Sequence, residues 1–382
     1  MSNPTDSQPD LSMLVSFSGE GGVERMVLNL VNAIAERGLQ IDLLLIKTRS
    51  KHLQEIHPAV NLIELGTRHT ATSLLPLTRY LKRTRPPCLL VAKDRAGRMA
   101  VIARALAGAT QTRLILRLGT NLTAALAHKS PWRMRLRQLP IRLLYPRIDR
   151  IIAVSEGVRQ DTLAVSGIDP ERVTVVRNPV ITPHLMASAT VPPPHPWLGN
   201  PDFPVILGVG RLTLQKDFDC LLRAFAQLRS TRQCRLIILG EGRQRDDLLE
   251  LSRQLGITAD LALPGFTPNP YIYMRLADLF VLSSRWEGSP NVLTEAMALG
   301  TPVVSTNCPS GPSEILDHGS VSPLVPVGDW RALAEAMESV LDKGPDKTVL
   351  REAVQEYTAQ RSATHYLEIM GLSPSHTDAA FD

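Results

Sequence analysis

Short hydrophobic runs alternate with longer amphipathic segments along most of the chain. In the first half, runs rich in Leu, Ile and Val predict strands at residues 11–17, 41–46, 89–92, 114–117, 150–154 and 173–176. In the second half they predict strands at residues 205–209, 235–239, 261–263, 278–282 and 303–306. Helical patterns separate the runs, among them residues 23–37, 218–228, 244–255 and 330–341. Apolar strands that alternate with helices are typical of parallel α/β sheets covered on both faces.

The alternation stops once, at a proline-rich segment, and then restarts. A chain of 382 residues is long enough for two domains. We therefore predict an α/β protein with two doubly wound domains. Its parts are an N-terminal domain at residues 1–180, a linker at 181–203, a C-terminal domain at 204–355, and a tail at 356–382 that packs back on the N-terminal domain. Ligands of such sheets bind beyond the carboxyl ends of the strands.

Two glutamates flank a junction between a strand and a helix in the C-terminal half. Glu287 lies in the loop, and Glu295 follows in the second turn of the helix. We expect Ser289 to cap this helix, Pro290 to be its first residue and Gly300 to end it. Free N–H groups at a helix start bind anions, and carboxylates bind hydroxyl groups. A sugar nucleotide combines both kinds of group.

A second loop at a strand end carries two cations. Arg211 follows the strand at 205–209, and Lys216 lies just before the helix at 218–228. Two cations near the positive end of a helix favour an anion between them, such as a diphosphate. The cations would offset the charge of a departing diphosphate without a metal ion. Two solvated surface cations are the alternative interpretation of this pair alone.

Three glycine-containing loops lie at other strand ends. Gly21 and Gly22 follow the first strand, where they would let the backbone approach a ligand. The third glycine of the dinucleotide fingerprint is absent, and a tight turn is the alternative. Gly242 follows another strand, and Phe266 follows the next one, where its ring would lie near a base. Core packing is the alternative for Phe266.

Composition narrows the class of protein. A hydrophobic fraction of 44% with 21% charged residues is typical of a globular protein. The four cysteines have no metal-like or paired spacing, which favours a reducing compartment. The polar start predicts no signal peptide, and no apolar run approaches the roughly 18 residues that a membrane span requires.

Positive charge is concentrated in the first half. Residues 1–190 carry 26 Lys and Arg against 14 Asp and Glu, whereas the remainder carries 16 against 23. Between Arg113 and Arg150 there are nine basic residues and one acid, interleaved with apolar side chains. Such a stretch suits an anionic membrane surface. A solvated amphipathic helix is the alternative, because three prolines limit a long interfacial helix.

Taken in order, these residues resemble the family-four retaining glycosyltransferases, the glycosyl transferases group 1. The ordered set is Gly21-Gly22, Gly210-Arg211, Gln215-Lys216, Gly240-Glu241-Gly242, Gly265-Phe266, Glu287 with Glu295, and residues 300–304. The match covers nearly the whole chain. It implies a GT-B fold, in which two Rossmann-like domains face each other across a cleft. The first domain binds the acceptor and the second binds the nucleotide sugar.

The resemblance also implies roles for single residues. Arg211 and Lys216 would bind the donor diphosphate and stabilise the departing nucleotide, Glu287 would orient the donor sugar, and Glu295 would hold the ribose. The remaining donor-binding positions are Gly21, Gly22, Gly242, Phe266, Gly288, Ser289, Asn291, Val292 and Leu293. The reaction would retain the anomeric configuration by front-face attack, with a UDP-sugar as donor and with no cofactor or metal.

Residues 307–316 resemble the version found in enzymes that build surface polysaccharides, including lipopolysaccharide, and lipid-linked glycans. The expected acceptor is therefore a lipid-linked diphosphate or a glycan. The expected location is the cytoplasm, on the inner face of the cytoplasmic membrane. Many family members have a histidine where this chain has residues 117–121, which contain none, so that role is unassigned.

Two other functions are compatible with parts of the sequence. A sugar-nucleotide epimerase with a GT-B fold would use the same donor site without an acceptor. A nucleic-acid-binding protein would explain the basic first half, but the basic stretch contains no zinc-finger, homeodomain or RNP pattern. The acidic second half would also repel a polyanion. The identity of the sugar, the acceptor and the linkage does not follow from the sequence.

Overall fold

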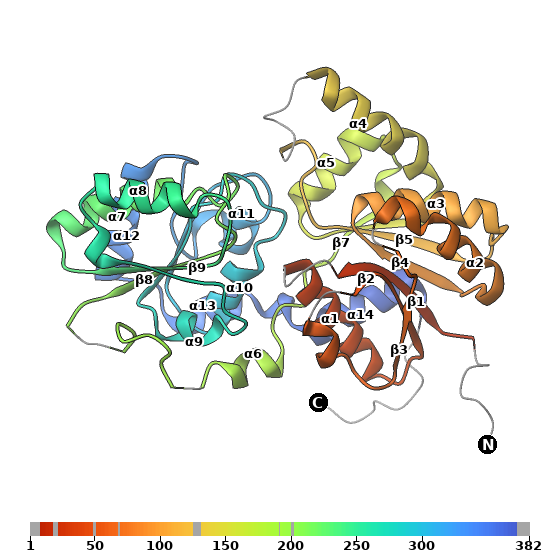
Figure 1. The fold of residues 1–382 in the computed structure, drawn as a ribbon, viewed down its shortest axis with the longest axis horizontal. Coiled ribbons are helices and arrows are strands. Elements are labelled where there is room, and N and C mark those ends of the chain that lie inside the picture. The colour runs from red at the N-terminus through yellow and green to blue at the C-terminus, as the bar shows by residue number, and fades with distance from the viewer. Residues whose placement is uncertain are drawn as a thin grey trace. The chain divides into compact units, whose positions relative to one another are not determined.

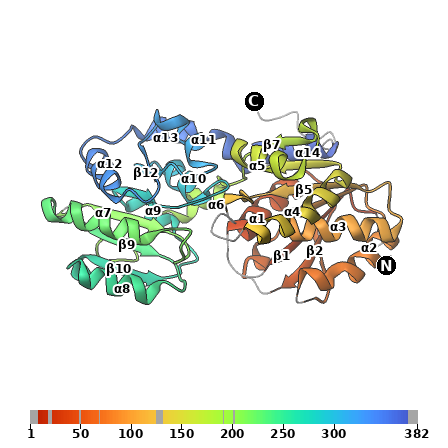
Figure 2. The ribbon, with the colours of Figure 1, turned by 90° about the horizontal axis from the view of Figure 1, so that it is seen from above.

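The computed structural model describes residues 8–17, 22–48, 51–67, 69–124, 131–190, 192–199 and 202–372. The chain divides into two compact units (Figure 1). Unit 1 comprises Met1–Pro179 and Ala359–Asp382, and unit 2 comprises Val180–Thr358. In each unit helices surround a central parallel sheet, as Figure 2 shows from a second direction.

The sheet of unit 1 has seven parallel strands in the order β3-β2-β1-β4-β5-β6-β7. They are β1 (Leu11–Phe17), β2 (Ile41–Thr48), β3 (Val60–Glu64), β4 (Cys88–Ala92), β5 (Arg113–Leu118), β6 (Arg150–Ala153) and β7 (Val173–Val175). The hydrophobic pattern missed β3. This strand lies at the edge of the sheet, and only its first residue, Val60, is buried, so it has no continuous apolar run.

Two hydrophobic clusters cover the two faces of this sheet. One cluster contains side chains of α1 (Gly22–Ala35) and α14 (Ala359–Met370). The other contains side chains of α2 (Leu74–Thr84), α3 (Asp94–Ala107), α4 (Pro131–Leu144) and α5 (Glu156–Ser166). The fully apolar strands between them, such as β4, are buried along their whole length. Burial on both faces is the reason that these strands read as continuous hydrophobic runs.

Unit 2 repeats this architecture with six parallel strands in the order β10-β9-β8-β11-β12-β13. They are β8 (Val205–Val209), β9 (Arg235–Leu239), β10 (Leu261–Gly265), β11 (Leu279–Leu282), β12 (Val303–Thr306) and β13 (Leu324–Val325). One face packs against α7 (Phe218–Thr231), α8 (Arg245–Gln254) and α12 (Trp330–Asp342). The other packs against α6 (Pro183–Ser188), α9 (Tyr271–Leu276), α10 (Asn291–Ala298) and α13 (Lys347–Ala353).

The segment predicted as an interdomain linker is part of unit 2, so that prediction was wrong. Within residues 181–203, α6 starts with Thr182 as its cap, and the Thr182 hydroxyl accepts from the N–H of Leu185 at 3.1 Å. Pro183 occupies the first turn, where proline needs no N–H. Leu185 is buried in the core of unit 2, and Asn269 bonds the carbonyl of Ser188. Pro183 therefore marks the start of a helix in this segment.

The C-terminal helix α14 returns to unit 1, where it packs beside α1. Ala363, Tyr366 and Leu367 of α14 are buried in the same cluster as the core of α1. The Ser362 hydroxyl donates to the carbonyl of Arg177, which lies just before the chain leaves this unit. Unit 1 therefore begins its second segment at Ala359, three residues after the predicted start of the tail.

Each sheet has one point where the strand order reverses. In unit 1 this topological switch point lies between β1 and β4, and in unit 2 it lies between β8 and β11. The loops that follow the two strands diverge there, which leaves a crevice at the carboxyl edge of an α/β sheet. The loops after β8 and β11 contain most of the residues that the sequence selected.

Candidate active site

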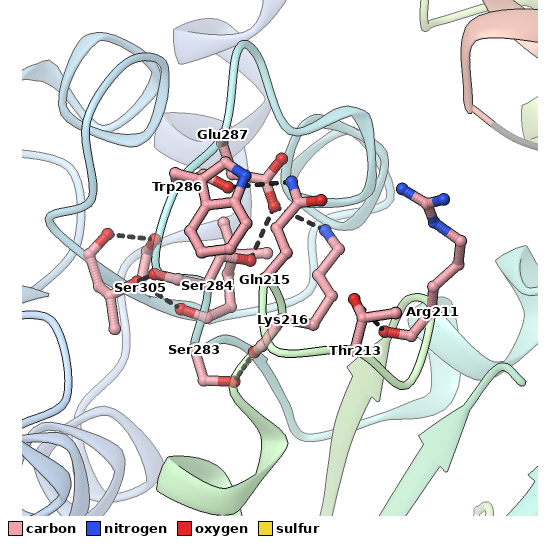
Figure 3. Close-up of polar contacts among 11 residues, drawn as sticks. Arg211, Thr213, Gln215, Lys216, Ser283, Ser284, Trp286, Glu287 and Ser305 are labelled. Carbon is pink, nitrogen blue, oxygen red and sulfur yellow. Dashed lines mark hydrogen bonds and ion pairs between the residues drawn. The ribbon is translucent and has the colours of Figure 1, made fainter. Parts of the chain in front are cut away.

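The last residues of the loop after β8 are hydrogen-bonded to the loop after β11 (Figure 3). The N–H of Arg285 donates to the carbonyl of Gln215 at 2.8 Å, and the Gln215 amide donates to the carbonyl of Trp286 at 3.0 Å. The Ser283 hydroxyl donates to the carbonyl of Lys216 at 2.7 Å. These bonds hold Lys216 and the Glu287 loop in one rigid arrangement at the switch point.

Lys216 and Glu287 form an ion pair, with 2.7 Å between Nζ and Oε1. The two side chains are only 15% and 9% exposed. The buried Ser284 hydroxyl donates to the same carboxylate oxygen at 2.7 Å. The sequence placed these two residues in separate roles, and it did not predict that they contact each other or that Ser284 takes part. Because the pair is buried, each charge is strongly attracted to its partner.

Arg211 lies apart from this pair, at the start of the loop after β8 (Figure 3). Its residue is exposed, and its guanidinium has no hydrogen bond or ion pair within the described parts of the chain. An exposed guanidinium without a carboxylate partner is free to bind an anion in a two-pronged geometry. The structure thus gives the two predicted cations different environments.

Asp217 ion-pairs with Arg285, with 2.9 Å between Arg285 Nε and Asp217 Oδ2. Asp217 is the N-cap residue of α7, where it adopts a left-handed backbone conformation with φ of 49° and makes no side-chain capping bond. Burial raises the pKa of Asp217 above its usual value of 3.8, although Arg285 acts in the opposite direction. This pair adds another link between the two loops.

The helix after the Glu287 loop starts one residue later than a cap at Ser289 would place it. Pro290 is the cap residue, Asn291 is the first helical residue, and Ser289 makes no capping bond. Its hydroxyl oxygen is buried without a hydrogen-bond partner in the described structure. The fixed φ of Pro290 sets the direction in which the chain enters α10, so Pro290 and not Ser289 is the cap residue. An unpaired buried hydroxyl beside a helix start is a candidate ligand for an anion.

The other predicted residues of this segment differ in accessibility. Gly288 and Glu295 are buried, and Asn291 and Val292 are half-buried. Leu293 is fully buried, and its N–H donates to the carbonyl of Pro290 at 3.0 Å. The prediction that the Leu293 backbone cradles a phosphate therefore conflicts with this bond, since the N–H already closes the first turn of the helix.

Glycines allow the neighbouring loops to approach the site closely. A Cβ at Gly242 would lie 2.2 Å from the carbonyl oxygen of Leu212, and one at Gly240 would lie 1.9 Å from that of Gly210. A Cβ at Gly210 would lie 2.8 Å from Lys216 Cε. Gly242, which was predicted to bind the donor, thus packs closely against the backbone of the loop after β8.

Phe266 follows β10 and is 50% exposed, so it does not pack in the core. Gly22 is the first residue of α1 in unit 1, and Gly21 lies outside the described residues. Unit 1 contributes a second ion pair that the sequence analysis missed, between Lys93 and Glu24 at its own switch point. The signal was present, because Lys93 directly follows the apolar strand β4, and Arg211 likewise lies close to the end of β8.

Within the basic stretch, residues Pro131–Leu144 form α4, with Pro140 inside the helix. Leu139 and Leu143 are 54% and 57% exposed, while Ile141 is buried in the core. The side chains of Arg133, Arg135 and Arg137 lie outside the described residues. No helix in the described parts is long and apolar enough to span a bilayer. Among the described residues, no group of three or more His, Cys, Asp or Glu side chains is arranged to hold a metal ion.

Comparisons with known proteins identify relatives of both units. The family model described as "Glycosyl transferases group 1" matches residues 196–361, and that described as "Glycosyltransferase Family 4" matches residues 20–183. The chain is 29% identical to the lipopolysaccharide core biosynthesis glycosyltransferase LpsE of Rhizobium meliloti, over 94% of this chain and 98% of LpsE.

A second relative comes from Campylobacter jejuni. It is an N-acetylgalactosamine-N,N'-diacetylbacillosaminyl-diphospho-undecaprenol 4-alpha-N-acetylgalactosaminyltransferase, 28% identical over 87% of this chain and 90% of its own. Among solved structures, Anabaena HepE in complex with UDP and glucose superposes with a TM-score of 0.73. It is 18% identical, and the match covers 95% of this chain and 99% of HepE.

Proposed function

Because the chain belongs to the glycosyl transferases group 1 and to Glycosyltransferase Family 4, we propose that it is a retaining enzyme that transfers a sugar from UDP to a lipid-linked or polysaccharide acceptor. The predicted fold class, α/β with two Rossmann-like units of the GT-B type, is confirmed by the two sheets and by the structural relatives. The epimerase and nucleic-acid alternatives gain no support from these relatives.

The buried Lys216–Glu287 pair at the switch point of unit 2 carries the proposal. A donor diphosphate at this edge would attract Lys216, and the exposed Arg211 would bind its outer oxygens. The unpaired hydroxyl of Ser289 would donate to the same phosphate. As negative charge develops on the leaving nucleotide, these donors would stabilise it, and no metal ion is then required.

Glu287 would hold hydroxyl groups of the donor sugar. Its carboxylate is oriented by Ser284 and Lys216, both at 2.7 Å from Oε1. Glu295, in the second turn of α10, would hold the ribose, and the exposed ring of Phe266 would stack on the base. In this proposal neither glutamate acts as a nucleophile, so the chemistry differs from that of retaining glycosidases.

Three relatives support the finer parts of the proposal. The HepE structure contains UDP, and the Campylobacter relative forms an alpha linkage on a diphospho-undecaprenol acceptor. LpsE acts in lipopolysaccharide core biosynthesis. A lipid-linked acceptor would place this protein in the cytoplasm at the inner face of the cytoplasmic membrane. The exposed Leu139 and Leu143 on the basic helix α4 would then enter the headgroup region.

A donor screen tests the proposed activity. Thermal shift with UDP, GDP, ADP and TDP sugars would identify the donor, and NMR of the product would give its anomeric configuration. We expect one UDP-sugar to raise the melting temperature and to yield an alpha product. An inverted product, or a metal requirement that persists with purified protein, would contradict the retaining, metal-independent mechanism.

Flotation with liposomes tests the membrane surface. We expect binding to vesicles that contain anionic lipid, and loss of binding when Leu139 and Leu143 are both replaced by Ser. Neutralising Arg133, Arg135 and Arg137 should reduce binding as well. No flotation of the unmodified protein, or flotation that these variants leave unchanged, would contradict a docking role for α4.

A further inference from the structure

An ion pair spans the switch point of unit 1, at the carboxyl edge of its sheet. Lys93 directly follows β4, and its Nζ lies 3.3 Å from Oε1 of Glu24, in the first turn of α1. The same ammonium lies 3.3 Å from the carbonyl oxygen of Ser16 in β1. It therefore contacts elements on both sides of the point where the strand order reverses, the place where open α/β sheets bind ligands.

The two members of the pair differ in accessibility. The Glu24 side chain is 6% exposed, whereas that of Lys93 is 37% exposed. Glu24 is thus buried beneath a lysine that reaches the surface. An ammonium has three N–H donors, and two of them have protein acceptors here, both at long distances. The third donor remains for a ligand at the carboxyl edge of the sheet.

The backbone holds Lys93 in an unusual conformation. Its φ of 89° and ψ of 138° lie in a region that side chains with a Cβ rarely adopt. Such a conformation costs about 1–3 kcal/mol. The N–H of Lys93 bonds the carbonyl of Arg117 at 3.2 Å, and its own carbonyl accepts from the N–H of Gly97 at 3.1 Å. Both bonds fix the direction in which the lysine leaves the strand.

Charge selects the kind of ligand. Glu24 offsets the positive charge of Lys93, so the pair as a whole attracts a dianionic phosphate much less than an unpaired cation such as Arg211 does. The Lys216–Glu287 pair is neutral in the same way, and the diphosphate proposed there is bound with the help of the unpaired Arg211. A charged N–H donor in a neutral pair is well suited to the oxygen of a neutral hydroxyl group. A sugar hydroxyl at the switch point of unit 1 matches this chemistry.

We propose that Lys93 binds a hydroxyl group of the acceptor sugar and that Glu24 is the positioning residue that holds Lys93 in place. The inference rests on the proposed glycosyltransferase function, and it assigns to unit 1 the recognition of the acceptor by its sugar and not by its phosphate.

Kinetics with Lys93→Met test the assignment, with octyl glycosides of glucose, galactose and N-acetylglucosamine as acceptor probes. Loss of a charged hydrogen bond should raise the acceptor KM about 10- to 100-fold. The UDP dissociation constant should not change, because Arg211, Lys216 and Ser289, the side chains proposed to bind the diphosphate, belong to unit 2. Lys93→Arg should recover part of the acceptor affinity, and Lys82→Met, at an exposed position of α2, is the matched control.

Deoxy acceptors separate recognition from a merely structural effect. One deoxy glycoside should lose affinity with the unmodified enzyme but lose nothing further with Lys93→Met, because the contact is already absent. Glu24→Gln should raise the acceptor KM less than Lys93→Met. An unchanged acceptor KM in Lys93→Met, equal further losses for every deoxy sugar, or a weaker affinity for UDP would overturn the inference. If the unmodified enzyme transfers no sugar, the proposed function itself fails before any variant is compared.

Discussion

The two switch points carry the same pair of side chains with their positions exchanged. In unit 2 the lysine follows β8 and the glutamate follows β11, whereas in unit 1 the glutamate follows β1 and the lysine follows β4. Accessibility also differs, since Lys216 is 15% exposed and Lys93 is 37% exposed. In one unit the cation is enclosed by hydrogen-bonded loops, and in the other it lies over a buried acid.

This difference shows how one fold provides two kinds of site. The site in unit 2 adds a free guanidinium, an unpaired hydroxyl and an exposed ring, which together suit a nucleoside diphosphate. The pair in unit 1 provides the ammonium of Lys93, 37% exposed and on a strained backbone, which suits a hydroxyl group. Ligand chemistry is therefore set by the neighbours of the pair and not by the pair itself.

The largest effect is expected at Gly242. Its Cβ would meet the carbonyl oxygen of Leu212 at 2.2 Å, and backbone atoms cannot move aside cheaply. Gly242→Ala should therefore lower the free energy of unfolding by about 3 kcal/mol or more. Differential scanning calorimetry should show the loss in the transition of unit 2.

Gly210→Ala is the matched control for that variant. Its Cβ would meet the flexible Lys216 side chain, at 2.8 Å from Cε, and not the backbone. Stability should change little while affinity for UDP falls, because Lys216 is displaced. Equal stability losses in both variants would show that the loop after β8 is not held by close backbone contact.

Glu287→Gln should lower kcat about 100-fold, the cost of removing one well-placed charged group from a transition state. The amide keeps the shape and the contact with Ser284, so nucleotide affinity should remain near that of the unmodified enzyme. Steady-state kinetics and UDP titration give both values. Full turnover in this variant would show that Glu287 has no role in the reaction. The proposed difference between Glu287 and Glu24 would then no longer hold.

Phe266→Ala should weaken UDP binding by about 1–3 kcal/mol, the usual value of a base stacked on an aromatic ring. Because the ring is 50% exposed, the melting temperature should change little. Isothermal titration calorimetry measures the binding, and Leu214→Ala, at another exposed position of unit 2, is the control. A large loss of stability with unchanged binding would mean that Phe266 packs and does not stack.

The smallest effect is expected for thiol alkylation, in both units alike. Burial raises the pKa of Cys88 in unit 1 to about 12 and that of Cys308 in unit 2 to about 12. For Cys308 the nearby Glu287 adds to the rise. Only the thiolate reacts, so iodoacetamide at pH 8 should leave the native protein unmodified and should label all four cysteines in urea. Rapid labelling of Cys308 alone would mean that its loop opens.

The sequence predicted the elements that are apolar along their length and missed those that are not. Strands such as β8 and β9 are buried on both faces, and their predicted bounds match the structure. The edge strand β3 and the two-residue β13 have too few buried positions to produce a pattern.

At the site, sequence reasoning located loops but not contacts. Lys216 and Glu287 are 71 residues apart, and Lys93 and Glu24 are 69 apart. Only the strand order brings each pair together, and the strand order is not encoded in local patterns. The cap at Ser289 was wrong for a local reason, because the proline that follows it sets the start of the helix.

UDP titration of two single variants separates the roles proposed for the two lysines, with Lys216 binding the donor and Lys93 binding the acceptor sugar. Lys216→Met should weaken UDP binding about 10-fold or more, since it removes a charged donor from the diphosphate. Lys93→Met should leave the dissociation constant of UDP unchanged. Equal weakening in both variants, or weakening in Lys93→Met alone, would contradict the assignment of the donor to unit 2 and of the acceptor sugar to unit 1.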